Sequence, residues 1–282
     1  MSYFFGLVGY PAAHSRSPWI HNHFLDQQQK QGIYRVFETP PDEFASTLKA
    51  MRTLQIDGFN VTVPYKERIL SFLDEVDPYA KMIGAVNTVH LENGKWIGYN
   101  TDGKGFIRSF KESYPRHSFS EMKVLCIGAG GAAKGIYRAL VEENTPSVDI
   151  ANRSQQRAQE MLDLKSSETN TSILTLEEAE EKMSEYDMIV QTTSVGMAPN
   201  DKESILSLTH VHPDAVVCDI VYRPMETAFL KEAKERGAHV LYGHGMLLYQ
   251  AALSYEIWTS SVLKAELLLE KFEQQLKGEE PC

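Results

Sequence analysis

The clearest sign of chemistry in this sequence is a glycine-rich segment that follows an apolar run and precedes a helical pattern. Its residues are Gly128, Ala129, Gly130, Gly131, Ala132 and Ala133. In a dinucleotide-binding loop, one glycine turns the chain, another lets the backbone approach a pyrophosphate, and a small residue allows the helix to pack on the strand. The segment predicts a dinucleotide site, and the alternative is a glycine-rich turn that binds nothing.

The residues after the next predicted strand indicate which dinucleotide binds. They are Asn152, Arg153, Ser154 and Arg157. An NAD site places Asp or Glu at this point to bind the ribose hydroxyls, whereas a 2′-phosphate is bound by arginine. Because Asp149 lies back within the strand, the sequence predicts NADP. The alternative is that both arginines are solvated helix residues.

Four polar segments of the first third of the chain are candidates for a second site. They are residues 9–18, 59–66, 84–88 and 100–103. Ser15 and Ser17 place two hydroxyls at the start of a predicted helix, where a small carboxylate can be held by hydrogen bonds. Each segment lies at an end of a strand-like run, and ligands of open α/β sheets bind outside the carboxyl ends of strands. The four segments are therefore predicted to form one pocket.

The elements that position these residues alternate between strands and helices, which predicts an α/β fold. Strands are expected at residues 4–8, 33–37, 58–61, 86–91, 124–127, 148–151, 188–191 and 216–220, and helices at 17–29, 42–54, 132–143, 154–162, 176–184, 226–236 and within 245–275. Ser17 is expected to cap the first helix, with Pro18 in its first turn. The rhythm predicts a substrate domain at 1–103 and a Rossmann-like NADP domain at 104–242. The final helices, 243–282, are expected to pack back on the first domain.

Composition excludes several classes of protein. The chain of 282 residues has 38 acidic and 28 basic side chains and a net charge of −10, so its field repels nucleic acids and anionic membranes. No apolar run approaches the roughly 18 residues of a membrane span, and no secretory signal is expected. Cys126, Cys218 and Cys282 are odd in number and far apart, which favours reduced thiols in a cytoplasmic protein without a structural metal.

Eight motifs, in order along nearly the whole chain, resemble one family. They are HSRSPWIHN at 14–22, NVTVPYK at 60–66, GAVNT at 84–88, NTDG at 100–103, GAGGAA at 128–133, NRS at 152–154, DIVYRPMET at 219–227 and GMLLYQA at 245–251. On these motifs the sequence resembles the shikimate dehydrogenase family. The resemblance implies NADPH-dependent, reversible reduction of 3-dehydroshikimate to shikimate in aromatic amino-acid biosynthesis.

The resemblance also implies roles for individual residues. Lys66 and Asp102 would form the catalytic pair, in which Lys66 exchanges the hydroxyl proton and Asp102 orients it, while the nicotinamide exchanges the hydride. Substrate would be bound by Ser15, Ser17, Thr62, Lys66, Asn87, Asp102, Tyr222 and Gln250. The cofactor would be bound by Gly128, Ala129, Gly130, Gly131, Ala132, Asn152, Arg153, Ser154, Arg157, Ile220 and Gly243. His244 departs from the family, whose members more often carry Asp, Asn or Gly there.

Three alternatives remain at this point. The first is a quinate/shikimate dehydrogenase that prefers NAD, against which the absence of an acid after Asn152 argues. The second is a relative that acts on another small hydroxy acid. The third is a non-catalytic, NADP-dependent sensor, against which the presence of both Lys66 and Asp102 argues. A monomer or homodimer with a small-molecule substrate, and with no nucleic-acid or membrane partner, is expected in each case.

Overall fold

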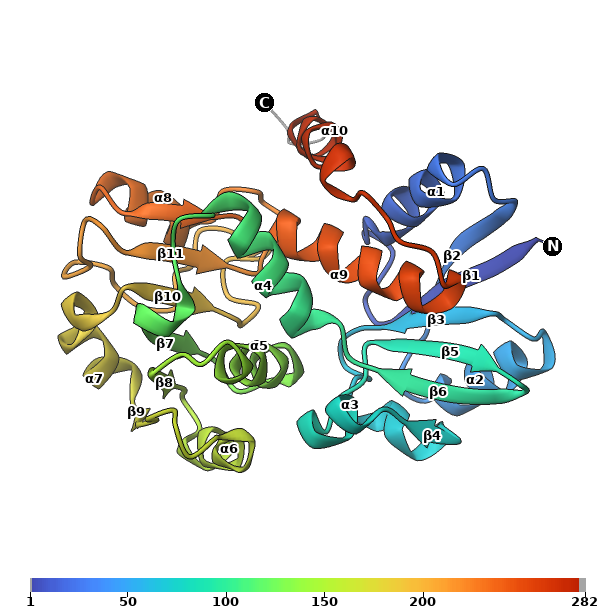
Figure 1. Cartoon of the computed structure of the whole chain (residues 1–282), viewed down its shortest axis with the longest axis horizontal. Coiled ribbons are helices and arrows are strands. Elements are labelled where there is room, and N and C mark those ends of the chain that lie inside the picture. The colour runs from blue at the N-terminus through green and yellow to red at the C-terminus, as the bar shows by residue number, and fades with distance from the viewer. Residues whose placement is uncertain (1, 279–282) are drawn as a thin grey trace. The chain divides into compact units, whose positions relative to one another are not determined.

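The computed structural model describes residues 2–278, which form two compact units. The first unit contains Met1–Thr101 and Leu248–Glu266, and the second contains Asp102–Leu247 and the residues from Leu267 onward. The chain thus leaves the first unit, builds most of the second and returns (Figure 1). Cys282 and the last residues of the predicted substrate domain lie outside the described part of the chain.

The first unit is built on a mixed six-stranded sheet with the order β2-β1-β3-β5-β6-β4. Its strands are β1 (Tyr3–Gly9), β2 (Gly32–Glu38), β3 (Gly58–Val61), β4 (Glu75–Val76), β5 (Thr88–Glu92) and β6 (Lys95–Tyr99), and its helices are α1 (Ser17–Gln27), α2 (Phe44–Thr53) and α3 (Pro78–Ile83), with a 3₁₀ turn at Arg68–Phe72. The first three predicted strands are confirmed within one residue at each end. β1 is parallel to both β2 and β3, as the alternating pattern predicted.

The β5–β6 hairpin corrects the predicted strand at 86–91. β5 begins only at Thr88, and β6, which had no counterpart in the prediction, pairs with it in antiparallel register. Asn93 and Gly94 connect the two strands, with φ angles of 52° and 78°. An Asn-Gly pair with both φ angles positive is typical of a tight hairpin turn. The Asn93-Gly94 pair is therefore the sequence signal for this hairpin.

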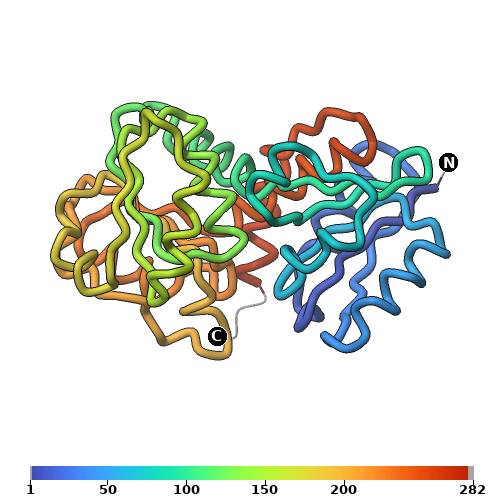
Figure 2. Tube along the Cα trace, turned by 90° about the horizontal axis from the view of Figure 1, so that it is seen from below, coloured from blue at the N-terminus to red at the C-terminus, as the bar shows by residue number. Residues whose placement is uncertain are grey.

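Helices cover both faces of the first sheet. Phe44 and Leu48 of α2 pack in one core with Phe59 and Trp96 of the sheet. On the other face, the late part of the chain supplies aromatic side chains: the ring of Trp258 stacks on Phe5 with centroids 4.6 Å apart. Figures 1 and 2 show this late red segment beside the blue strands. The first unit is therefore completed by residues about 250 positions from its start.

The start of α1 differs from the prediction in its cap. Ser17 is the first helical residue rather than the cap, and Arg16 before it makes no side-chain capping bond. The Ser15 hydroxyl instead accepts the Ser17 N–H at 3.2 Å. Pro18 does lie in the first turn, where its missing N–H costs nothing. The capping role thus moves two residues toward the N-terminus.

The second unit is a parallel six-stranded sheet with the order β12-β11-β10-β7-β8-β9. Its strands are β7 (Lys123–Ile127), β8 (Ser147–Ala151), β9 (Ile173–Leu174), β10 (Met188–Gln191), β11 (Val216–Asp219) and β12 (His239–Leu241), and its helices are α4 (Asp102–Ser113), α5 (Gly131–Glu142), α6 (Gln155–Glu160), α7 (Leu176–Glu181) and α8 (Ala228–Glu235), with 3₁₀ turns at Phe119–Glu121, Met161–Leu164 and Met183–Glu185. All four predicted strands are confirmed; β11 ends one residue early. The helix predicted at 132–143 is confirmed with a shift of one residue, and those predicted at 154–162, 176–184 and 226–236 are confirmed but shorter.

Alternate residues of β7 serve two cores, as in a sheet covered by helices on both faces. Val124 and Cys126 pack in the core of α4 and α5, whereas Leu125 and Ile127 pack in the core of α7 and α8. Such strands are buried on both sides, which explains their continuous apolar runs. The predicted Rossmann-like α/β class is confirmed. Among the described helices, none is long and apolar enough to cross a membrane.

The C-terminal region contains two helices where the sequence predicted one helical stretch. α9 spans Gly243–Thr259 and α10 spans Glu266–Lys277. Residues after Glu266 group with the second unit, which differs from the predicted domain of residues 243–282. The reason is local packing: Glu273 of α10 hydrogen-bonds to His244 at 3.0 Å, and Phe272 lies against the same imidazole.

Candidate active site

The glycine-rich segment follows β7, the strand at which the strand order of the second sheet reverses. From β7 the chain runs through α5 to β8 on one side, whereas β10 lies on the other side of β7. Gly128 has a φ of +114°, and a Cβ there would lie 2.5 Å from Thr192 Oγ1. A side chain is therefore excluded at Gly128 by both conformation and space. Ligands of open α/β sheets bind at such a switch point.

The start of α5 fits a dinucleotide phosphate. The first amide groups of a helix have no acceptor within it, and Gly130 caps α5 without a side chain. A Cβ at Gly130 would meet no atom within 4 Å, so the space in front of these amides is open. The first turn carries no acidic residue. Gly128, Ala129, Gly130, Gly131 and Ala132 thus form a loop whose backbone can bind an anion.

The end of β8 presents cations and no carboxylate. Ser154 caps α6 by accepting the Arg157 N–H. Arg153 therefore lies directly before the cap, and Arg157 lies in the first turn of the helix. Both arginines are exposed, and within residues 2–278 neither pairs with an acid. Asp149 is buried within the strand, where it accepts hydrogen bonds from Tyr186 and from the Ser172 N–H. This donor set matches a phosphate on the ribose better than a ribose with free hydroxyls.

The other predicted cofactor residues lie at the ends of β11 and β12. Ile220 follows β11, and Gly243 begins α9 just after β12. A Cβ at Gly243 would lie 2.5 Å from the carbonyl oxygens of Ile220 and Val221, so only glycine allows this approach. Tyr222 is half-buried in the same loop. The second unit therefore brings together every predicted cofactor residue at the carboxyl edge of its sheet or next to it.

In the first unit, one edge of the sheet collects the predicted substrate residues. β1 and β3 end at this edge, and β5 begins there because it runs antiparallel to β3, with Asn60 opposite Thr88. β6 ends there because Tyr99 also lies opposite Thr88. The edge thus carries the loops of Ser15 and Ser17, Thr62 and Lys66, Asn87, and Thr101. The four polar segments thus lie at one edge of the sheet up to Thr101, and their convergence on one pocket stays a prediction.

Gly9 brings two of these loops into contact. A Cβ at Gly9 would lie 2.2 Å from the Thr62 methyl group, and the Tyr10 N–H donates to the Val63 carbonyl at 3.0 Å. Ser15 and Ser17, whose hydroxyls are 3.2 Å apart, follow in the first of these loops. The second loop carries Thr62. Hydroxyl groups from two loops are therefore held at one edge.

The turn that carries Lys66 is rigid. The buried Tyr65 stacks on Phe44 with ring centroids 4.1 Å apart, and its hydroxyl donates to the Thr39 carbonyl at 2.5 Å. The carbonyl of Lys66 accepts the Val86 N–H at 2.8 Å. Lys66 itself is half-buried. The backbone on both sides of the lysine is thus fixed, which suits a group that must meet a substrate in one geometry.

Asn87 and Gln250 meet in a fixed orientation. Asn87 Oδ1 accepts from the Thr101 N–H and from the Thr88 hydroxyl, both at 2.9 Å. Its Nδ2 therefore donates, to Thr101 Oγ1 at 2.9 Å and to Gln250 Oε1 at 3.2 Å. Gln250 comes from α9, 163 residues further along the chain. The hydrogen bonds leave neither amide group free to exchange its oxygen and nitrogen ends.

Sequence reasoning missed the buried residues that connect this cluster. The Tyr34 hydroxyl donates to Asn60 Oδ1 at 2.8 Å, and Asn60 Nδ2 donates to Ser254 Oγ at 3.0 Å and to the Asn87 carbonyl at 3.1 Å. Burial raises the pKa of Tyr34 well above its ordinary value, while a hydrogen bond with Ser17 opposes the shift. A polar network thus runs from Ser17 to Asn87. The available signal was Asn60, a polar residue inside a short apolar strand.

His21 lies beside this network and predicts a pH dependence of stability. Burial lowers its pKa to about 3, so the folded protein excludes a proton that the unfolded chain binds below pH 6.5. Stability is therefore lost as pH falls, and between pH 6.5 and 5 this group contributes a loss of about 2 kcal/mol. His21→Phe, which keeps a ring to stack on Tyr34, should remove that contribution.

Urea unfolding followed by tryptophan fluorescence measures this effect, because Trp19, Trp96 and Trp258 all lie in the first unit. His210→Phe, in the second unit, is the matched control and should leave the pH dependence unchanged, since His210 is exposed. Equal pH slopes for the wild type and His21→Phe would contradict the prediction.

Asp102 and Lys66 fall in different units. Asp102 is the first residue of α4 and of the second unit, directly after Thr101, and it is 4% exposed. Tyr222 also belongs to the second unit, whereas the other predicted substrate residues belong to the first.

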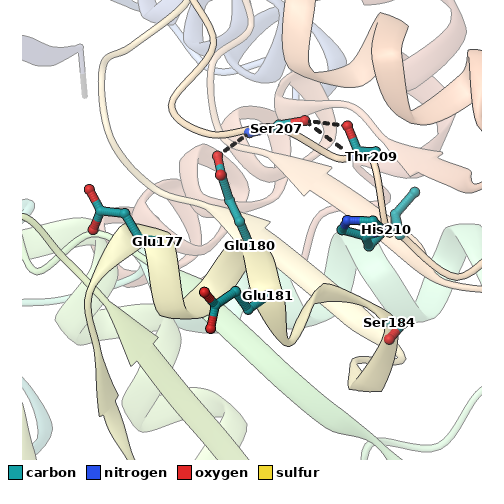
Figure 3. A pocket seen from close by; sticks show the side chains of 8 residues that line it. Glu177, Glu180, Glu181, Ser184, Ser207, Thr209 and His210 are labelled. Atoms are coloured by element: carbon teal, nitrogen blue, oxygen red, sulfur yellow. Dashed lines mark hydrogen bonds between the residues drawn. The ribbon is translucent and has the colours of Figure 1, made fainter.

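A pocket of about 710 Å³ lies away from all of these residues (Figure 3). It is lined by Glu177, Glu180, Glu181, Ser184, Ser207, Thr209, His210 and Val211. Glu180 points toward the 207–209 loop and accepts the Ser207 N–H at 2.6 Å. The lining precedes β10 and β11, so it belongs to the amino edge of the sheet. Its three carboxylates would repel phosphates, and it is not the dinucleotide site.

Comparison with known proteins agrees with this geometry. Three family models match the chain: shikimate dehydrogenase substrate binding domain over residues 7–89, shikimate / quinate 5-dehydrogenase over 111–224, and shikimate 5′-dehydrogenase C-terminal domain over 243–262. A shikimate dehydrogenase (NADP(+)) from Oceanobacillus iheyensis is 47% identical over 96% of this chain and 98% of its own.

Solved structures of similar proteins share the fold. Shikimate 5-dehydrogenase from Thermus thermophilus, in complex with NADP(H) and shikimate, has a TM-score of 0.86 at 33% identity and covers 96% of this chain and 99% of its own. Quinate dehydrogenase from Corynebacterium glutamicum, in complex with NAD, has a TM-score of 0.87 at 29% identity, with coverage of 97% and 99%. With 47% identity to a relative over nearly its full length, the chain belongs to the shikimate dehydrogenase family.

Proposed function

We propose that this protein is an NADP-dependent shikimate dehydrogenase that interconverts shikimate and 3-dehydroshikimate in aromatic amino-acid biosynthesis. The observation that carries the proposal is the polar edge of the first sheet, where Ser15, Ser17, Thr62, Asn87 and Gln250 gather, in a chain 47% identical to a protein of that name. A small polyhydroxy acid needs such a site, because each hydroxyl requires an oriented partner.

We assign the ends of this edge to different parts of the substrate. Ser15 and Ser17, beside the first turn of α1, would hold the carboxylate by hydrogen bonds and the helix dipole. Asn87 and Gln250, with Thr62, would bind ring hydroxyls, and Tyr222 would contribute from the second unit. The carboxylate is thus bound without a buried salt bridge, whose desolvation is expensive.

Lys66 and Asp102 are proposed as the catalytic pair. In the direction of oxidation, Lys66 takes the proton of the reacting hydroxyl at Nζ, and Asp102 orients that hydroxyl and the ammonium group. Bound NADP accepts the hydride from the hydroxyl-bearing carbon.

The second unit would hold NADP through backbone and cations. The amides of residues 128–132 would bind the pyrophosphate, and Asn152, Arg153, Ser154 and Arg157 would bind the adenosine with its 2′-phosphate. Ile220 and Gly243 would contact the nicotinamide end. A protein with a net charge of −10 thereby binds a polyanion through local groups.

One assay tests the proposal. Purified protein with shikimate and NADP should generate NADPH absorbance, and NAD and quinate serve as the alternative partners. A higher kcat/KM with NAD or with quinate would favour the quinate/shikimate alternative, for which the C. glutamicum quinate dehydrogenase is the specific precedent. Activity only with another small hydroxy acid would favour a diverged relative. Tight NADP binding with no turnover of any of them would favour a sensor.

Thr101→Val tests the polar edge. The change removes the hydroxyl that accepts from Asn87 Nδ2 and donates to the Gln250 carbonyl, but it keeps the side-chain shape. Of the two hydrogen bonds lost, the one that Asn87 donates bears on substrate binding, and since one such bond is worth about 1 kcal/mol, we expect KM for shikimate to rise about fivefold with little change in kcat.

Thr145→Val is the matched control for this substitution. Thr145 is fully buried in the second unit, and its hydroxyl donates to the Leu140 carbonyl at 2.7 Å. The control should lose comparable stability and keep the KM for shikimate. A KM for Thr101→Val equal to that of the wild type would contradict the role of Thr101 in orienting Asn87 and Gln250.

We further propose that the protein works in the cytoplasm as a monomer or homodimer on small molecules. Cys126 and Cys218 support a reducing compartment, because both thiols are free and fully buried. Burial raises the pKa of Cys126 to about 12 and raises that of Cys218, so neither is a reactive thiolate.

A further inference from the structure

Two buried polar side chains join the loop after β11, which carries Ile220 and Tyr222, to the loop after β10. We propose that Asp219 and Gln191 are a positioning pair for NADP, which holds the loops after β10 and β11 in the shape that receives the cofactor. The inference rests on the proposed function, since it concerns the same NADP site.

The two residues are neighbours across the sheet. β10 and β11 are parallel, and Gln191 lies opposite Asp219 in their register, each as the last residue of its strand. Gln191 Nε2 donates to Asp219 Oδ1 at 3.2 Å. The side chains are 1% and 2% exposed. A hydrogen bond between the ends of two strands fixes the points from which both loops start.

Asp219 holds the loop that follows β11. Its Oδ1 accepts the Val221 N–H at 2.8 Å, and its Oδ2 accepts from the Thr227 hydroxyl at 2.7 Å. Thr227 in turn caps α8, since its hydroxyl oxygen accepts the Leu230 N–H. The carboxylate therefore closes the segment 219–227 at both ends. Tyr222 lies inside this closed segment.

Gln191 holds the loop that follows β10. Its Nε2 also donates to the Val195 carbonyl at 3.0 Å, and its Oε1 accepts the Thr193 N–H. Thr192, which lies between Gln191 and Thr193 in this loop, is so close to Gly128 that a Cβ on the glycine would clash with the threonine hydroxyl. The loop held by Gln191 thus borders the turn proposed to bind the pyrophosphate. The pair thus connects the loop beside the proposed pyrophosphate turn with the loop that carries Ile220 and Tyr222.

The hydrogen-bond partners of Asp219 favour the ionised form of its carboxyl group. All three of its partners, the Gln191 amide, the Val221 N–H and the Thr227 hydroxyl, donate to it, and none of them titrates. Burial nevertheless raises the pKa of Asp219 to about 6. The folded protein therefore holds this charge at neutral pH at a cost to its stability, since folding favours the protonated form. Such a cost is typical of a functional rather than a purely structural group.

The test compares Asp219→Asn with Asp149→Asn. Asp149 is also a buried carboxylate of the second sheet with two bound donors, but it contacts no predicted cofactor residue. For Asp219→Asn we expect the NADP dissociation constant, measured by calorimetry, to rise about tenfold. We expect kcat at saturating NADP to stay within about twofold of the wild type. Affinity for adenosine 2′-monophosphate should stay within about twofold of the wild type, because that fragment lacks the 5′-phosphate and is proposed to contact only the residues after β8. Asp149→Asn should keep both affinities.

Two measurements on the apoprotein separate positioning from stability. The melting temperature of Asp219→Asn near pH 8 should fall no further than that of Asp149→Asn, because each variant replaces one carboxylate oxygen by an NH2 group that faces a donor. Amide hydrogen exchange should accelerate in residues 192–199 and 220–227 and not in β7 or β8. Gln191→Leu, made from the other strand, should reproduce the affinity pattern. The double variant should bind NADP about as weakly as the weaker single variant, since the two act as a unit.

Equal loss of affinity for NADP and adenosine 2′-monophosphate in Asp219→Asn, or an unchanged NADP affinity, would overturn the proposal. A lowered melting temperature with unchanged exchange in the two loops would overturn it as well. These outcomes are separate from failure of the proposed function, because NADP binding by the wild type is measured without shikimate. A wild type that binds NADP but does not oxidise shikimate would refute the activity and leave the positioning pair to be judged.

Discussion

Replacing Lys66 with methionine is expected to lower kcat for shikimate oxidation by about 10³, in the range that positioned general acids and bases contribute. The variant keeps the aliphatic stem and the rigid turn built by Tyr65, so the fold and the shape of the edge remain. What it loses is the group that takes the hydroxyl proton. Initial rates of NADPH formation at saturating substrates measure the effect.

Two controls test whether the effect is specific to Lys66. Lys81→Met removes an exposed lysine of the same unit and should leave kcat unchanged. For Lys66→Ala, an added small alkylamine should restore part of kcat, because it supplies a proton acceptor to the vacated space. A tenfold rise in KM with kcat intact would show instead that Lys66 only binds substrate.

Removing Arg153 and Arg157 is expected to abolish the preference for NADP. Each guanidinium can make charge-assisted hydrogen bonds to the 2′-phosphate, worth about 1.5 kcal/mol or more, so each alanine variant should lose about tenfold in kcat/KM with NADP. The double variant should lose about 100-fold, provided the two arginines act independently. With NAD, which lacks that phosphate, kcat/KM should change less than twofold. Steady-state kinetics with both cofactors gives the ratio.

Arg236→Ala is the matched control for this pair. Arg236 is an exposed arginine of the same unit that pairs with Glu232 within 3.6 Å. The variant should have an unchanged kcat/KM with NADP and with NAD, because exposed ion pairs of this kind contribute little to stability. If the Arg153 and Arg157 variants lost NADP and NAD activity equally, the arginines would be supporting the fold of the loop and not reading the phosphate.

The sequence predicted best where local pattern and physical cause coincide. The strands predicted at 124–127 and 188–191 begin with continuous apolar residues because both faces of their sheet are covered, and they were located to within a residue. The Gly128 turn was predictable because its conformation excludes other residues. The hairpin at Asn93 was missed because the apolar run of residues 86–91 was taken as the whole element.

The rest depended on distances that sequence spacing does not contain. Gln191 and Asp219 become partners only because β10 and β11 are adjacent in the sheet. Asn60 and Ser254 are 194 positions apart, and the bond between them arises from the return of α9 to the first sheet. Sequence reasoning could name the residues that meet ligands by their types. It could not name those that orient them, because any buried polar residue has the same local signature.

Because α9 is translated after most of the chain, its position in the sequence affects how the first unit folds during synthesis. When the ribosome has released residues up to Thr101, Asn60 and Thr88 still lack the Ser254 hydroxyl that both contact, and Phe5 lacks the Trp258 ring that covers it. Buried polar groups without partners are costly. The half that is translated first is therefore expected to reach its native state only after α9 emerges. Until then its aromatic face is a natural binding site for chaperones.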